Sequence, residues 1–322
     1  MQYPRERFKP SRDRRVLRGP RVGIIVVVVV GVLAAATAVF FIARGARGLS
    51  FAELDAINLA QEAFEAGEFG QTVAIVDDIL EEDPLNASAL VLKGFAHYHR
   101  GVNSIAVDER SRDLDTAIVS LRRALLLGSV PASERVYHVL GKAYYHKGPY
   151  FVDSAIAYLE ESVAAGYDQS ESYEYLGLAY SDSGNYRQSA DNYLLALRAR
   201  PVEERDVIYV FLAQSYRELD DLEEAAYYLR LAINTSQDSF LTLQAQFALA
   251  EVLNELGNTD QAVLQYEAIL EENPQSAEAL IRLGDIYEET GNPERARFYW
   301  RRVVTEVDPE NREAIERLER QQ

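Results

Sequence analysis

The chain has 322 residues, of which 48% are apolar, so it is long enough and apolar enough to bury a sizeable core. It carries 33 basic residues, 51 acidic residues and no cysteine. A net charge of −18 argues against nucleic-acid binding, which needs a positive surface. The lack of cysteine excludes disulfides, thiolate metal sites and a cysteine nucleophile.

The charge is unevenly distributed along the chain. Residues 1–47 hold ten basic and two acidic side chains, whereas residues 48–322 hold 23 basic and 49 acidic ones, a net charge of −26. The sequence therefore predicts a basic tail over residues 1–21 and a strongly acidic body further along the chain.

Residues 22–42 contain no charged side chain. Twenty-one helical residues rise roughly 31 Å, which matches the hydrocarbon core of a bilayer. We expect a transmembrane helix here, followed by a linker over residues 43–52. Ala36-Thr37-Ala38 has the form of a signal-peptide cleavage site, but the apolar run continues through Ile42 and is longer than a signal core. A retained anchor is therefore favoured over a cleaved signal peptide.

The basic residues predict the orientation of this span. Eight of them precede it, and only Arg44 and Arg47 follow closely. By the positive-inside rule, the N-terminus stays in the cytoplasm and the acidic body is extracytoplasmic, which in a bacterium means periplasmic. The expected location is the inner (cytoplasmic) membrane, as a single-pass protein. A contact of the tail with anionic lipid or nucleic acid is the less favoured interpretation.

The acidic body contains an internal repeat. A twelve-residue phrase appears as YHVLGKAYYHKG, YEYLGLAYSDSG, YVFLAQSYRELD and LIRLGDIYEETG, at Tyr137–Gly148, Tyr173–Gly184, Tyr209–Asp220 and Leu280–Gly291. Weaker copies lie at Ala56–Gly67, Leu90–Gly101 and Gln246–Gly257. A second apolar segment with a small residue follows each copy. The units start near residues 53, 87, 134, 170, 206, 243 and 277.

This pattern resembles the tetratricopeptide repeat, W-x₂-L-G-x₂-Y, then A-x₃-F, then P, over 34 residues. The resemblance covers residues 53–309 and implies an all-α fold, a right-handed solenoid of about seven helix pairs. Each pair buries its apolar face only by stacking on its neighbours. The charged segment 310–322 is expected to be the capping helix. With the predicted span, the chain is similar to membrane-anchored bacterial proteins of this family.

The residue pattern explains why such a unit folds. Leu140, Gly141 and Tyr144 fall on one stripe of the first helix, and the small residue lets the second helix approach closely. One insertion of about eleven residues, within Val102–Asp115, breaks the period, and its charge predicts an exposed loop or an extra helical turn. The alternative, that this insertion contacts a partner protein, remains open at this point. The third unit has a smaller insertion, of two residues, around Pro149–Asp153.

The resemblance implies a concave face lined by the first helix of each unit. The residues mapped to this predicted groove in the middle units are Phe95, Tyr98, His99, His138, Lys142, Tyr145, His146, Tyr175, Leu178 and Phe211. In the last two units the same face carries Glu251, Glu255, Asp285, Glu288 and Glu289. An aromatic groove suits the capture of a peptide or helix by apolar anchors. The alternative is that these rings cover the core.

Common motifs of catalysis are absent from the sequence. It has no glycine-rich phosphate loop, no H-E-x-x-H and no G-x-S-x-G. Its four histidines lack the helical spacing of a ligand pair with an acidic partner. We therefore expect no enzymatic activity, no catalytic residues, no metal and no cofactor.

The resemblance implies a membrane-anchored scaffold that mediates protein–protein interactions on the periplasmic side and assembles an envelope, secretion or motility complex. The expected partners are other proteins or peptides, and not nucleic acid. One alternative is a chaperone-like holdase for exported proteins. Another is a structural subunit that self-associates into a homo-oligomer, for example a component of a periplasmic flagellar collar.

Overall fold

The computed structural model describes residues 51–128, 130, 132–201 and 204–320. By its internal contacts the chain divides into Met1–Asp55 and Ala56–Gln322, and nearly all of the described residues belong to the second unit. The predicted basic tail, membrane span and most of the linker lie outside the described residues. Among the described residues, no helix has the length and apolarity needed to cross a membrane.

The regular elements of the described residues are helices, and they follow the chain as pairs. The pairs are α2 (Phe51–Glu65) and α3 (Phe69–Glu82), α4 (Ala87–Asn103) and α5 (Val107–Leu126), α6 (Ser133–His146) and α7 (Val152–Ala164), α8 (Ser170–Asp182) and α9 (Tyr186–Ala199), α10 (Asp206–Glu218) and α11 (Leu222–Thr235), α12 (Ser239–Glu255) and α13 (Thr259–Glu272), and α14 (Ala277–Glu289) and α15 (Pro293–Arg302). A short 3₁₀ turn, η1 (Pro149–Phe151), precedes α7. A π-helical turn, η3 (Val303–Val307), continues α15, and α16 (Arg312–Arg320) ends the described chain.

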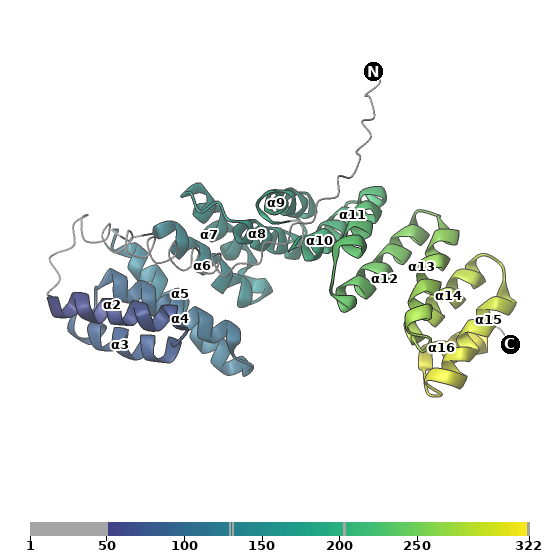
Figure 1. The fold of residues 1–322 in the computed structure, drawn as a ribbon, viewed down its shortest axis with the longest axis horizontal. Helices are drawn as coiled ribbons and strands as arrows, with labels where there is room; N and C mark the ends of the chain where they lie inside the picture. The colour runs from purple at the N-terminus through teal and green to yellow at the C-terminus, as the bar shows by residue number, and fades with distance from the viewer. Residues whose placement is uncertain (1–50, 129, 131, 202–203, 321–322) are drawn as a thin grey trace, which may run out of the picture. The chain divides into compact units, whose positions relative to one another are not determined.

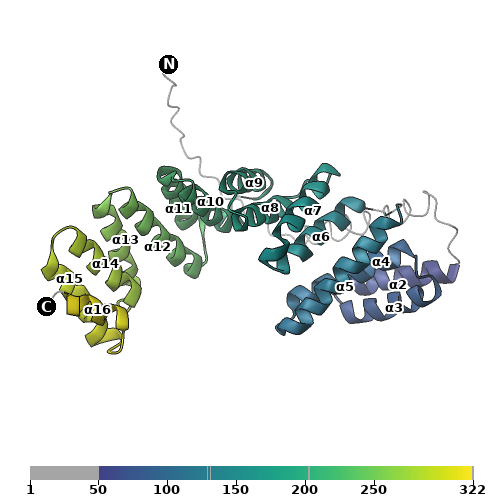
Figure 2. The same ribbon diagram turned by 180° about the vertical axis from the view of Figure 1, so that it is seen from behind.

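Successive pairs stack on one another in chain order. The second helix of each pair packs on the first helix of the next, from α3 against α4 to α13 against α14. The first helices α4, α6, α8, α10 and α12 also contact one another in sequence. Figures 1 and 2 show this order from opposite sides. The predicted all-α solenoid is therefore confirmed for the described residues, and α16 packs against α15.

Glycines let the two helices of a pair come close. Gly177 of α8 faces the Tyr193 ring of α9, and a Cβ atom at this glycine would lie 2.6 Å from Cε1 of that ring. Gly284 faces Trp300 of α15 in the same way. The Trp300 indole is fully buried, and its Nε1 donates a hydrogen bond to the Ile281 carbonyl oxygen at 3.3 Å. The small position of the repeat is thus the point of closest approach within a pair.

The apolar core is a series of clusters along the stack. One cluster runs from α4 to α7 and contains Leu140 and Ala155. The next is centred on Tyr193 and begins at α8. A third extends from α10 to α14, and a fourth, around Trp300, joins α14, α15 and α16. The α7–α8 junction therefore lies between two of these clusters.

The insertion of the second unit is almost entirely helical. It lengthens α4 and α5 and leaves only Ser104–Ala106 as a connecting turn. Its charge predicts solvent exposure, but Asp113 and Leu114 are buried, at 8% and 1% exposed. Asp113 is accommodated because its carboxylate lies 2.6 Å from Nδ1 of His97. The expectation of exposure is therefore wrong for these two residues.

Candidate interaction surface

Aromatic rings from the first four units form one continuous series of contacts, which we call the aromatic run. Its members, in order of contact, are Phe69, His99, Tyr98, His146, Tyr175 and Tyr145. Phe69 stacks on His99 with 4.9 Å between ring centroids, and His99 meets Tyr98 at 5.3 Å. Tyr98 lies 6.2 Å from His146, and Tyr175 lies 5.6 Å from both His146 and Tyr145. The run therefore links α3, α4, α6 and α8.

Lys142 of α6 lies beneath the aromatic run. Its Nζ is 2.5 Å from a carboxylate oxygen of Glu171 on α8, the first helix of the next unit. The same ammonium lies 5.3 Å from the ring centroid of Tyr98 and 4.9 Å from that of Tyr175. A cation over ring faces is held by the negative potential of the π-systems. The lysine charge is therefore compensated within the protein.

His138 completes this polar junction between α6 and α8. Its Nε2 lies 3.2 Å from Glu171, and its Nδ1 lies 3.0 Å from the Ser172 hydroxyl. Burial lowers the pKa of His138, so the ring is neutral at pH 7. A neutral ring donates one hydrogen bond and accepts one. We assign the donated bond to Nε2, toward Glu171, and the accepted bond to Nδ1, from Ser172.

The Glu171 carboxylate is the charged centre of the junction. Hydrogen bonds, first from His138 and then from Lys142, lower its pKa to about 2, against the opposing effect of burial. Burial also lowers the pKa of His99 and of His146, and the Lys142 charge acts in the same direction. Both histidines are therefore neutral at pH 7. The aromatic run is a largely uncharged surface.

The structure brings together seven of the ten predicted groove residues. These seven are Tyr98, His99, His138, Lys142, Tyr145, His146 and Tyr175. Phe95 lies nearby under the guanidinium of Arg135, 5.7 Å from its ring centroid. Leu178 and Phe211 belong instead to the cluster around Tyr193, on which the Phe211 ring stacks at 5.8 Å.

Four of the predicted groove residues are buried rather than outward-facing. Phe95, Tyr98, His138 and Lys142 are between 3% and 9% exposed. They fill the space between consecutive first helices, where the helices contact each other. The accessible residues of the surface are His146, which is exposed, and the partly buried Phe69, His99, Tyr145 and Tyr175.

Sequence reasoning missed Glu171, Ser172 and Phe69. Glu171 pairs with Lys142, 29 residues away, and Ser172 pairs with His138, 34 residues away. These separations are close to one repeat length. Residues of complementary chemistry, placed about one repeat apart on consecutive first helices, are the signal that finds such pairs.

The acidic residues of the last units are also paired within the protein. Arg217 of α10 binds both Glu251 and Glu255 of α12, and Arg282 lies 3.5 Å from Glu251. Arg317 of α16 forms a two-pronged ion pair with Asp285 of α14. The face predicted to be acidic is thus partly neutralised.

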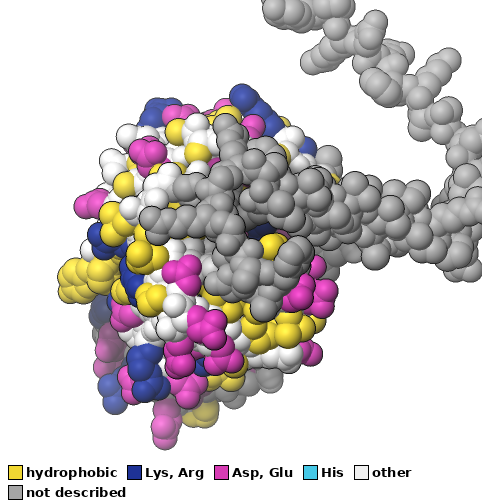
Figure 3. Space-filling model, turned by 90° about the vertical axis from the view of Figure 1, so that its left-hand side faces the viewer, with side chains coloured by type: hydrophobic (Ala, Val, Ile, Leu, Met, Phe, Trp, Pro, Cys, Tyr) yellow, Lys and Arg dark blue, Asp and Glu magenta, His cyan; other side chains and the backbone are white. Residues whose placement is uncertain are grey.

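The surface at the other end of the described chain is mixed in character. In Figure 3, acidic side chains at the α2–α5 end are interspersed with apolar ones rather than gathered in one patch.

In the described part of the chain, no three His, Asp or Glu side chains are grouped so that they could hold a metal ion. What the described residues offer at this surface is a set of rings and compensated charges. Such a surface is chemically suited to apolar and hydrogen-bonded contacts.

Residues 176–239 and 247–319 match the family model of the tetratricopeptide repeat. The fold is similar to the C-terminal part of a tetratricopeptide repeat protein from Cytophaga hutchinsonii, with a TM-score of 0.63 and 16% identity over 81% of this chain and 99% of that chain. A chain in the structure of Naa15/Naa10 bound to HypK-THB gives a TM-score of 0.53 and 16% identity, covering 83% of this chain and 38% of that one.

A curated relative is the Protein CTR9 homolog of Arabidopsis thaliana, 34% identical over 105 residues. The match covers 32% of this chain and only 10% of the plant protein. The two matched segments, in the later units, are thus tetratricopeptide repeats by the family model, and the described helix pairs have the fold of this repeat. Proteins built from this repeat generally act as scaffolds for protein–protein interactions and are usually not enzymes.

Proposed function

We propose that this protein is a membrane-anchored scaffold that binds a segment of a partner protein on the aromatic run. The observation that carries this proposal is the unbroken contact of six rings across the first four units, five of which belong to exposed or partly buried residues. Aromatic side chains supply large contact areas with few rotatable bonds. They are the residues on which binding energy concentrates in protein interfaces.

The charges favour a particular kind of segment. The histidines of the run are neutral at pH 7, and Glu171 compensates Lys142, so neither the rings nor this lysine supplies an uncompensated positive charge for an acidic tail. The net charge of −26 over residues 48–322 attracts basic segments and increases their association rate at low salt. The preferred ligand is a segment with apolar anchors and flanking basic residues.

The test begins with peptides selected from a random display library against the full chain. Affinities of the selected peptides are then measured by fluorescence anisotropy for three variants. Tyr175→Ala removes a central ring and is expected to weaken binding at least about tenfold, the effect of losing about 1.4 kcal/mol. Tyr175→Phe keeps the ring and is expected to retain most of the affinity.

The control is Tyr227→Ala on α11, a ring that is 51% exposed and lies outside the aromatic run. This variant is expected to bind the peptides like the unaltered chain. Equal losses for Tyr175→Ala and Tyr227→Ala, with no loss of folding, would contradict binding on the aromatic run. An affinity that is unaffected by Tyr175→Ala would do the same.

The membrane part of the proposal is supported by the sequence of residues 1–47 alone. A reporter enzyme that is active only outside the cytoplasm, fused after Gln322, is expected to be active. Replacing the eight basic residues that precede residue 22 with neutral ones is expected to reduce this activity, because the positive-inside signal is lost. Activity of only a cytoplasm-specific reporter would contradict the periplasmic location.

The proposed role in an envelope, secretion or motility complex is tested through the partner. A photo-crosslinking residue at position 145 places the reactive group on the aromatic run, and one at position 227 serves as its matched control. A component of such a complex is expected to cross-link from position 145 alone, as identified by mass spectrometry. Cross-links only to unrelated, unfolded chains would favour the holdase alternative.

A further inference from the structure

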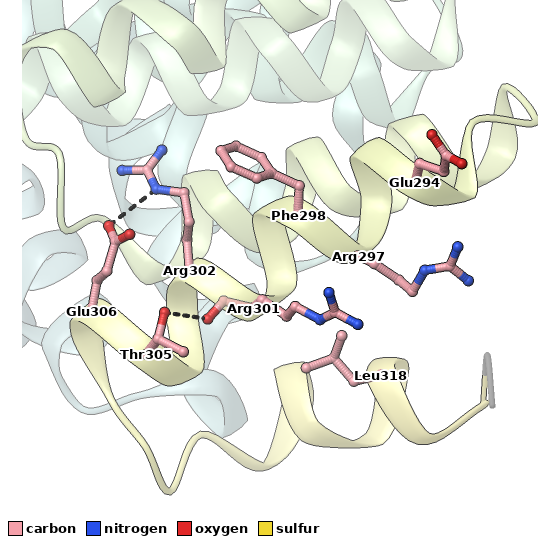
Figure 4. Close-up of a pocket in the computed structure, with 8 residues that line it drawn as sticks. All are labelled: Glu294, Arg297, Phe298, Arg301, Arg302, Thr305, Glu306 and Leu318. Atoms are coloured by element: carbon pink, nitrogen blue, oxygen red, sulfur yellow. Dashed lines mark hydrogen bonds and ion pairs between the residues drawn. The ribbon is translucent and has the colours of Figure 1, made fainter.

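A second surface lies at the other end of the described chain, and it does not depend on the proposed function of the aromatic run. The outer face of α15, the turn η3 and the adjacent helix α16 line an open groove of about 800 Å³. Its lining residues are Glu294, Arg297, Phe298, Arg301, Arg302, Thr305, Glu306 and Leu318 (Figure 4). We call it the α15 groove.

Its position follows from how the last unit ends. Trp300 and Ala296 bury the inner face of α15 against α14, and Ala314 of α16 joins the same cluster. The helix then widens into the π-helical turn η3, where the Thr305 hydroxyl donates a hydrogen bond to the Arg301 carbonyl oxygen at 2.9 Å. Such π-turns are frequent at functional sites. Helix α16 packs beside α15 and does not cover its outer face.

Two arginines of this groove are without partners. Within the described part of the chain, the guanidinium groups of Arg297 and Arg301 form no ion pair, hydrogen bond or ring contact. By contrast, Arg302 pairs with Glu306 at 3.1 Å. Figure 4 shows Arg297 and Arg301 extending from the side of α15 that faces Leu318. These two uncompensated cations give this side of α15 a local positive charge in a body that holds 49 acidic residues.

Apolar surface accompanies these cations. The Phe298 ring is 56% exposed, and Leu318 of α16 is partly buried at the groove. The guanidinium of Arg302 lies over the Phe298 ring, 6.0 Å from its centroid. The groove therefore offers both anion-binding and apolar contacts within one open hollow.

We propose that the α15 groove binds an acidic segment of a partner protein. Carboxylates of the segment pair with Arg297 and Arg301, which lie one helical turn apart on the same helix face. An apolar side chain between those carboxylates packs against Phe298 and Leu318. Charge complementarity selects an acidic partner, and arginine is the side chain best suited to hold carboxylates in two-pronged pairs.

The apolar contacts and the size of the groove favour a protein segment over a small anion. A free phosphate makes no use of an exposed phenyl ring, and a hollow of about 800 Å³ accommodates several side chains. The acidic Glu294 and Glu306 on the lining disfavour a uniformly anionic surface such as a lipid bilayer. Phosphate and anionic lipid vesicles are therefore included in the test as alternative ligands.

The test uses the full chain and a labelled twelve-residue peptide with four acidic residues around two leucines. A twin peptide carries the corresponding amides. Fluorescence anisotropy is expected to show binding of the acidic peptide, at least tenfold weaker binding of the twin, and weakening as salt rises. The double variant Arg297→Ala/Arg301→Ala is expected to lose at least tenfold in affinity, and Phe298→Ala several-fold.

Arg320→Ala is the matched control. This arginine is exposed on α16, lies 3.8 Å from Glu316 and does not line the groove, so its loss is expected to leave binding unchanged. Arg297→Lys/Arg301→Lys keeps the charge and is expected to retain partial binding, which separates a lost contact from a folding defect. Tyr175→Ala is expected to leave this peptide's affinity unchanged, so failure here and failure at the aromatic run are distinguishable.

Three outcomes would overturn the proposal. The first is equal affinity of the acidic peptide for the double variant and for Arg320→Ala. The second is groove-dependent binding of inorganic phosphate or of vesicles containing phosphatidylglycerol, without binding of the peptide. The third is concentration-dependent self-association in light scattering that the double variant abolishes, without peptide binding, since the occupant would then be a second copy of this chain.

Discussion

The residue at the closest approach of two paired helices determines how near they pack. At Gly177 the opposing atoms belong to Tyr193, whose ring is 1% exposed and stacks on Phe211. A ring held on both sides has no free space into which it can shift. Glycine is therefore required here by the lack of space for a Cβ atom, and not by its backbone angles.

We predict that Gly177→Ala lowers the free energy of unfolding by about 1–3 kcal/mol, because the new methyl group overpacks against Tyr193. The matched control is Gly70→Ala in α3, a helical glycine with no atom within 4 Å of its added Cβ. There alanine is expected to gain up to about 1 kcal/mol through helix propensity. Denaturant titration measures both, and equal effects of the two variants would contradict the packing argument.

A second residue-scale feature lies at the end of α10. The first helices α2, α6, α8, α12 and α14 are each followed by a glycine with positive φ, such as Gly184 at +76°. The corresponding residue in the fifth unit is Asp220, with φ of +60°. A residue with a Cβ atom is strained in this left-handed conformation, although aspartate tolerates it better than most.

We predict that Asp220→Gly raises the free energy of unfolding by about 0.5–1 kcal/mol, because it relieves this strain. The reverse change, Gly184→Ala, is expected to lower it by about 1 kcal/mol. Thermal melting of the two variants provides the measurement. A lower melting temperature for Asp220→Gly would show that the aspartate side chain stabilises the fold by more than its strained backbone conformation destabilises it.

At the scale of elements, the junction between α6 and α8 contains a buried histidine as well as an ion pair. The apolar cluster around Leu140 ends at α7, and the one around Tyr193 begins at α8. Hydrogen bonds and an ion pair among His138, Lys142, Glu171 and Ser172 connect the units across this step. The junction is therefore sensitive to protonation in a way that an apolar junction is not.

We predict that acid loosens this junction in two stages. The pKa of His138 is lowered below 6.5 in the folded state, so the unfolded chain takes up protons first and stability falls as pH drops below about 6.5. The pKa of Glu171 is lowered from 4.5 to about 2, so its contribution is present above pH 4.5 and is lost between 4.5 and 2.

Hydrogen exchange corrected for intrinsic rates measures the first stage. Amides of α6 and α8 are expected to exchange faster at pH 5 than at pH 7, while those of α14, which has no histidine nearby in sequence, change less. His138→Gln keeps a donor and an acceptor but removes the titrating group, and it is expected to reduce the difference. An unaltered pH response in this variant would exclude His138 as the cause.

Sequence reasoning reaches the repeat because its residues are constrained locally. The spacing of Leu140, Gly141 and Tyr144 predicts a buried stripe, and all three are buried. The groove residues are harder to predict, because their exposure depends on how far one first helix lies from the next. Tyr98 and Lys142 therefore fill a helix interface that the single-unit pattern does not describe.

At the scale of the whole stack, each unit depends directly only on its neighbours. The cluster around Trp300 joins α14, α15 and α16, whereas the cluster around Leu140 extends from α4 to α7. In such repeat arrays, stability is approximately a sum of unit and interface contributions. A defect at one end is therefore expected to spread only as far as the next junctions allow.

We predict that Trp300→Ala destabilises its own unit by about 3–5 kcal/mol, because it leaves a cavity where a fully buried indole had packed. Protection from hydrogen exchange is expected to fall in α14, α15 and α16 and to persist in α4 to α7. Phe298→Ala, at an exposed ring of the same helix, is the control and is expected to have little effect. Loss of protection throughout the chain would contradict a quasi-one-dimensional stack.

The polar junction between α6 and α8 also has a mechanical consequence. A force that pulls α3 away from α16 passes through each junction in series, because each pair packs mainly on its neighbours in the chain. Hydrogen bonds and close ion pairs break after short extensions and are replaced by water. Under tension, this junction is expected to yield before its apolar neighbours. Stretching would then draw Lys142 away from Glu171 and make the spacing of the rings above them depend on load.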